Sequence, residues 1–110
     1  MKFFRFADRF VPIRFFEDET CTVTLKICDE TDKRIIAVGG KIAAADKLTN
    51  TEKKLTMYRE ALDLLIGEEN AETILAHADE PDCFAIGSVI NYVFACYGEQ
   101  MRKKLSASVR

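Results

Sequence analysis

The sequence has few of the residues and motifs that usually carry catalysis. It contains a single histidine, His77, and no G-x-S-x-G nucleophile motif. The run Gly39-Gly40-Lys41 lacks the flanking spacing of a phosphate-binding loop. An exposed or structural histidine is far commoner than a catalytic one. We therefore predict a protein that is not an enzyme, with no catalytic residues and no cofactor.

The four cysteines do not have the spacing of a metal or redox site. Zinc ligands usually come in pairs about two to four residues apart. Cys21 and Cys28 are seven residues apart in an expected strand, and Cys83 and Cys96 are thirteen apart in an expected helix. We predict no metal site, and free thiols that pack as small apolar side chains.

Long apolar runs are also missing. No segment reads as a transmembrane helix, and the N-terminus lacks the continuous apolar stretch of a signal peptide. The chain has 110 residues, of which 48% are hydrophobic and 31% charged, as in ordinary globular proteins. We expect a single domain over residues 1–100, no membrane partner and a cytoplasmic location.

Charge is unevenly distributed along the chain. Residues 1–16 carry a net charge of +3, residues 17–100 carry −9, and residues 101–110 carry +4. The basic ends could contact nucleic acid, but the acidic body repels phosphate and no aromatic–basic stacking pattern accompanies the tail. We therefore do not expect a nucleic-acid partner, and we predict that 101–110 is a flexible basic tail.

The first part of the chain has the pattern of β-strands. Six of the eight phenylalanines lie in residues 2–16, and apolar and polar residues alternate in Phe4-Arg5-Phe6 and around Pro12. Since proline cannot donate a backbone hydrogen bond, its strand is expected either at a sheet edge or interrupted at Pro12. Residues 21–28 alternate most clearly and predict a second strand with one buried face. Together they predict a β-hairpin or small antiparallel sheet.

The second half has the period of helices. Leu55, Tyr58, Leu62 and Leu65 share one face of a helix over 52–66, with Thr51 as its N-cap and Gly67 at its end. A shorter helix follows over 68–78, and the turn at Pro81 ends it. Asp82 then caps an apolar helix over 83–97 that could continue to 105. That helix is either central to the core or part of a subunit interface.

Residues 31–49 allow two interpretations. Apolar residues at Ile35, Val38, Ile42 and Ala45 favour one helix capped by Thr31 or Asp32. The rival is a strand over 34–38, a turn at the two glycines and a helix over 41–48. We favour the single helix. The fold class predicted is α+β, with the N-terminal sheet followed by a bundle of three to four helices.

The helical half resembles small proteins encoded in the tail-morphogenesis clusters of phages and prophages of Gram-positive bacteria, which are similar to tail assembly chaperones. The resemblance rests on the step Leu65-Ile66-Gly67-Glu68, the pair Ile74-Leu75, the turn Pro81-Asp82 and the apolar helix that ends at Val93–Tyr97. It covers residues 52–97. The chain departs from the pattern over residues 71–80, which contain Ala71, Ala76 and Ala78.

The resemblance implies a non-enzymatic protein in the cytoplasm of a bacterial host cell that binds the tape-measure or another tail protein and self-associates as a homo-oligomer. The alternative is a bacterial adaptor or regulatory module with a different protein partner. Apolar helix faces and an aromatic N-terminus suit either function. Candidate contact residues are Phe15, Phe16, Tyr58, Leu62, Phe94 and Tyr97. The alternative is that all six are ordinary core residues, which we favour for Leu62 and Phe94.

Overall fold

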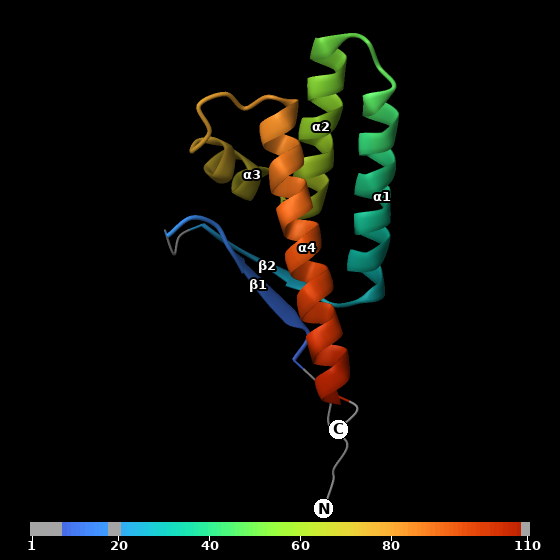
Figure 1. Ribbon diagram of the computed structural model, residues 1–110, viewed down its shortest axis with the longest axis vertical. Helices are drawn as coiled ribbons and strands as arrows, with labels where there is room; N and C mark the ends of the chain where they lie inside the picture. The colour runs from blue at the N-terminus through green and yellow to red at the C-terminus, as the bar shows by residue number, and fades with distance from the viewer. Residues whose placement is uncertain (1–7, 18–20, 109–110) are drawn as a thin grey trace, which may run out of the picture.

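The computed structural model describes residues 8–17 and 21–106, and the backbone of residues 107 and 108. A two-stranded antiparallel sheet precedes four helices, which confirms the predicted α+β class (Figure 1). The elements are β1 (Phe10–Arg14), β2 (Thr22–Lys26), α1 (Asp29–Asp46), α2 (Thr51–Ile66), α3 (Glu68–Leu75) and α4 (Cys83–Ser108).

The sheet buries one face against the helices. The buried side chains alternate along both strands, at Val11 and Ile13 in β1 and at Val23 and Leu25 in β2. The Phe15 amide donates to the Cys21 carbonyl at 2.8 Å, so these two residues form a hydrogen-bonded pair. Hydrogen-bonded and non-hydrogen-bonded pairs alternate along an antiparallel ladder, so Pro12–Thr24, three positions away, is a non-hydrogen-bonded pair. The ladder therefore loses no hydrogen bond at the proline. The predicted Phe4-Arg5-Phe6 strand lies outside the described residues.

Helix α1 confirms the single-helix interpretation of residues 31–49. It passes through Gly39 and Gly40 without a break, and a Cβ at either position would meet no atom within 4 Å. The glycines face outward, where the missing side chains cost no packing. The predicted N-cap was wrong: Cys28 occupies that position, and Thr31 is instead buried inside the first turn.

Helix α2 has the predicted length but a different cap. Asn50, rather than Thr51, is the N-cap, and its side-chain oxygen accepts from the Lys53 amide at 3.0 Å. Gly67 ends the helix with φ of 91°, a backbone conformation that suits glycine. This residue also precedes the first residue of α3, so it redirects the chain from one helix into the next.

The boundaries of α3 and α4 differ from the expected ones. Helix α3 ends at Leu75 rather than 78, because the amides of His77 and Ala78 bond to carbonyls only three residues back and tighten the last turn. Asp82 caps α4 as predicted, accepting from the Ala85 amide at 2.9 Å. Residues 101–108 form the last turns of α4, so the predicted tail begins as helix; its flexibility stays a prediction, as does the domain boundary at 100.

The core is centred on α2, which packs against α1, α3 and α4, while α4 also packs against β1 (Figure 1). Helix α4 therefore joins the helices to the sheet, as expected of a helix central to the core. The side chains that α2 buries completely are Ala61 and Leu62, with Leu65 almost as deep.

The chain's three tyrosines each connect two elements. The Tyr58 hydroxyl in α2 donates to Asp46 at the end of α1. The Tyr97 hydroxyl in α4 donates to Asp32, near the start of α1, at 3.0 Å. Tyr92 donates to the Arg14 carbonyl of β1 at 2.7 Å. These bonds hold α1 at both ends and attach α4 to the sheet.

Two leucines of α2 provide a matched test of this packing. Leu62 is 0% exposed, whereas Leu64, two residues later, is 39% exposed. Leu62→Ala should lower the free energy of unfolding by about 2–5 kcal/mol, because it leaves a cavity between helices. Leu64→Ala, measured by the same urea titration, should cost less than about 1 kcal/mol. Equal losses would contradict the burial pattern.

The tyrosine–aspartate bonds predict an alkaline transition. The hydrogen bond to Asp46 raises the pKa of Tyr58 to about 12, and burial followed by the bond to Asp32 raises that of Tyr97 to about 12. Because the ordinary pKa is 10, the unfolded chain loses these protons first. The stabilisation of the folded chain by these two protonated hydroxyls is complete below pH 10 and is lost as the pH rises towards 12.

Tyrosinate absorbance measures this directly. A folded sample should titrate about two pH units above a urea-unfolded one. Tyr97→Phe should remove one of the late-titrating groups. A folded sample that titrates at the ordinary tyrosine pKa would refute the two bonds.

Candidate functional site

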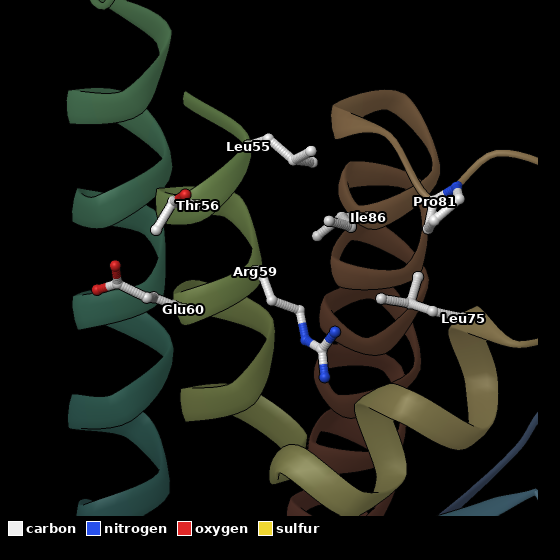
Figure 2. Close-up of a pocket in the computed structure, with 7 residues that line it drawn as sticks. All are labelled: Leu55, Thr56, Arg59, Glu60, Leu75, Pro81 and Ile86. Atoms are coloured by element: carbon white, nitrogen blue, oxygen red, sulfur yellow. The ribbon is translucent and has the colours of Figure 1, made fainter. Parts of the chain in front are cut away.

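An open groove of about 330 Å³ lies where α2, the end of α3 and the start of α4 meet (Figure 2). Its apolar surface comes from three elements and one turn: Leu55 of α2, Leu75 of α3, Pro81, and Ile86 of α4. Figure 2 shows Leu55, Ile86, Pro81 and Leu75 around the space between α2 and α4. The remaining lining residues are Thr56, Arg59 and Glu60, all on α2.

The fold positions these side chains through two turns. Gly67 reverses the chain between α2 and α3, which brings Leu75 back to the level of α2. The turn at Pro81 and the Asp82 cap then begin α4 beside it, so that Ile86 lies opposite Leu55 (Figure 2). The groove therefore depends on the helix–glycine–helix step and on the proline turn.

Arg59 extends along the groove and is held by two carboxylates. Its Nε lies 2.9 Å from Asp63 on the next turn of α2, and its Nη2 lies 3.9 Å from Glu72 on α3. Its charge is thereby balanced within the protein. Glu60 at the far side pairs with Lys41 of α1 at 3.2 Å. These surface pairs contribute little stability, but they orient the groove wall.

The surroundings of the groove are acidic. Residues 60–82 include eight Asp and Glu and no Lys or Arg. Asp79, Glu80 and Asp82 flank the lining residue Pro81, and Asp79 and Glu80 are exposed. Within the described residues, neither Asp79 nor Glu80 forms an ion pair. An occupant with basic and apolar side chains would match this site.

The polar groups that line the groove are engaged within the protein. Its seven lining residues include no histidine and no cysteine. The Thr56 hydroxyl donates to the Glu52 carbonyl at 2.9 Å, and the charged groups of Arg59 and Glu60 are engaged in ion pairs. What the groove offers is apolar surface bordered by charge, which is the arrangement of a protein-interaction site.

The six residues predicted as contacts do not form one surface. Four are buried in the core: Phe15, Tyr58, Leu62 and Tyr97. Phe94 is half-buried, and Phe16 is 54% exposed. The buried four cannot touch a partner without a rearrangement of the folded chain. A binding role for Phe16 and Phe94 stays a prediction.

Phe16 lies beside His77, the single histidine of the chain. The two rings stack with centroids 4.2 Å apart, and His77 Nδ1 is 3.1 Å from the Thr73 carbonyl. Phe16 also has a positive φ of 58°, which is uncommon for a residue with a side chain. The contact fastens the strand turn to the end of α3.

Sequence reasoning missed the groove residues Leu75, Pro81 and Ile86 as a set. They belong to three different segments, so no helical or strand period links them. The available signals were the proline turn, which forces the chain back on itself, and the acidic run on both sides of it.

A second hollow of about 510 Å³ lies at the start of α1, lined by Arg9, Lys26, Cys28, Asp29 and Glu30. The hydrogen bond between Cys28 and the Thr31 hydroxyl, 3.4 Å long, and the backbone amide of Thr31 lower the pKa of the Cys28 thiol. All four cysteines are free; Cys21 is buried and the others are half-buried.

Two features are absent from the described residues. No helix there is both long and apolar enough for a bilayer. No three His, Cys, Asp or Glu side chains in the same part of the chain gather as metal ligands would.

Comparison with known proteins identified no relatives: no family model, curated protein or solved structure matches the chain.

The Cys28 environment predicts selective thiol chemistry. With iodoacetamide at neutral pH, Cys28 should be alkylated first and the buried Cys21 last, because the thiolate is the reacting form. Thr31→Val removes the hydroxyl while keeping the side-chain shape, and should slow alkylation of Cys28 alone. Peptide mass spectrometry over a time course gives all four rates. A rate for Cys28 no higher than that for Cys96 would contradict this prediction.

Proposed function

We propose that this chain is a non-enzymatic assembly or structural protein of a phage or prophage tail, which acts in the bacterial cytoplasm by binding a helical segment of a tail protein such as the tape measure. The observation that carries the proposal is the apolar groove between α2, α3 and α4, with its acidic surroundings.

The groove has the form that helix recognition requires. An amphipathic helix presents apolar side chains at positions i, i+3, i+4 and i+7, and these anchors enter a groove made by other helices. Leu55 is half-buried and Pro81 exposed, and they offer the accessible apolar contacts, while Leu75 and Ile86, 7% and 1% exposed, form the floor beneath them. The groove is open, so a long partner can lie across it and continue on both sides.

The sequence resemblance supports the same function through the same residues. Its most specific part is the step Leu65-Ile66-Gly67-Glu68, followed by Ile74-Leu75 and the Pro81-Asp82 turn. Gly67, Leu75 and Pro81 are the residues that build or line the groove. The features that resemble tail assembly chaperones are therefore those that a helix-binding groove needs.

Affinity capture tests this function. The tagged chain is expressed in a bacterium that carries a prophage, the lytic cycle is induced, and the bound proteins are identified by mass spectrometry. We expect a long, helix-rich tail protein that stays bound in high salt, because apolar contacts are not screened. Leu55→Arg should reduce its recovery by at least about tenfold by placing a charge on the apolar groove surface.

Leu64→Arg is the matched control. Leu64 lies on the same helix, is partly exposed and does not line the groove, so this variant should recover the partner normally. Melting curves of both variants show that any loss is not due to unfolding. Capture of a cellular regulator instead would favour an adaptor. Equal recovery by both variants would exclude the groove as the binding site.

A further inference from the structure

We propose that the segment Lys2–Phe6 of one copy docks in the α2–α3–α4 groove of another copy. The proposal rests on the proposed function to the extent that both use this groove. It adds an occupant that is part of the chain itself, so that tail partner and neighbouring copy compete for one site.

The chemistry of this segment complements the groove. Its sequence, KFFRF, has three phenylalanines, two basic residues and no acidic residue. The accessible apolar surface of the groove is that of Leu55 and Pro81, over a buried floor of Leu75 and Ile86. Its one lining cation, Arg59, is balanced by Asp63 and Glu72. Phenylalanine side chains gain the most from such a surface, because each buries a large apolar area.

Charge also favours the docking of Lys2–Phe6 in this groove. Asp79 and Glu80 are exposed beside Pro81 and form no ion pair within the described residues, so they are available to Lys2 and Arg5 of a neighbour. The closest competitor for the site is the basic end of α4. Among its described residues it offers only Leu105 as a strongly exposed large apolar side chain, which is a weaker match than three aromatic rings.

Chain length excludes the groove of the same copy. Asp8 lies 3.6 Å from Lys104, near the far end of α4, whereas the groove lies at Ile86 near its start. Eighteen residues of helix separate these two levels, a distance of about 27 Å. Phe4 is four residues before Asp8 and can be at most about 14 Å from it. The middle of the segment therefore reaches a groove only in another molecule.

The contact joins two different surfaces, a donated segment and an accepting groove. Such an interface either closes into a ring or reciprocal pair, or continues from copy to copy. The contact also regulates the access of a tail helix to the groove, because the neighbour's segment must leave before the helix binds. Self-association should therefore decrease when the partner is added.

Sedimentation velocity of the full-length chain over a range of concentrations is the first test. The wild type should associate, and increasing salt should weaken the association by screening Lys2 and Arg5. The triple variant Phe3→Ala, Phe4→Ala, Phe6→Ala should associate at least about tenfold more weakly, because it loses the aromatic anchors.

A matched pair of threonines tests the groove. Thr56 and Thr73 are both exposed helical residues whose hydroxyls donate to the carbonyl four residues back, but only Thr56 lines the groove. Thr56→Arg adds a cation and bulk to the site and should abolish self-association. Thr73→Arg adds the same group elsewhere and should associate as the wild type does. Equal behaviour of the two variants would overturn the proposal.

Mixing the two variants tests for a gain of association rather than a loss of it. The phenylalanine triple variant has an intact groove, and Thr56→Arg has an intact segment. Each should be monomeric by itself, while an equimolar mixture should form a one-to-one complex. A mixture that stays monomeric would refute the proposal, as would a wild-type chain that is monomeric at every concentration.

The same variants separate the two proposals. The triple variant should still capture the tail partner, since its groove is intact and unoccupied. If it captures the partner but the wild type does not self-associate, only the docking of Lys2–Phe6 fails. If the wild type self-associates but captures no tail protein, only the proposed function fails.

Discussion

The strip of α2 that contains Ala61, Leu62 and Leu65 is the surface on which the other helices depend. These side chains are buried or nearly so, and α2 is the helix that contacts α1, α3 and α4. Burying a leucine contributes about 1.5–3 kcal/mol, so a few such residues supply much of the stability expected of a small domain. The groove lies at the other end of the same helix, where Leu55 is only partly covered.

Helix α1 shows why apolar burial is not sufficient. Only Thr31, Val38 and Ala45 are buried along its 18 residues. Ile35 and Ile42 also pack half-buried against the core, and hydrogen bonds at the two ends of the helix, from Tyr97 to Asp32 and from Tyr58 to Asp46, add to this packing. A tyrosine suits this purpose because its ring packs in the core while its hydroxyl reaches a polar group. Among the described residues, no buried side-chain nitrogen or oxygen lacks a hydrogen-bond partner.

Much of this fold follows from patterns within single elements. The alternation around β2, the period of α2 and the Pro81 turn each depend on near neighbours, and they predicted the α+β class and the order of elements. The caps at Thr51 and Thr31 were predicted wrongly because several residues in a row can cap a helix, and backbone geometry selects one. The contact residues were a different problem: periodicity identifies an apolar face, but it cannot show whether another element covers it.

Periodicity could not predict the groove either. Leu55, Leu75 and Ile86 come together only after two chain reversals, and each has the spacing of an ordinary core residue. The signal that distinguishes the region is electrostatic. Eight Asp and Glu within residues 60–82, without a Lys or Arg, repel one another in the folded chain and weaken it. Arg59 balances Asp63 and Glu72, but Asp79 and Glu80 have no such partner within the described structure.

Asp79 and Glu80 are exposed and solvated, so a cation beside them would add little stability. Their uncompensated charge next to an open apolar surface is what recognition of a basic, apolar segment requires, since it favours such a segment and rejects acidic ones. The segment Lys2–Phe6 has that composition, as do residues 9–16 and 101–105, which overlap β1 and α4. Under the docking that we propose, contact between copies brings this segment and the groove together.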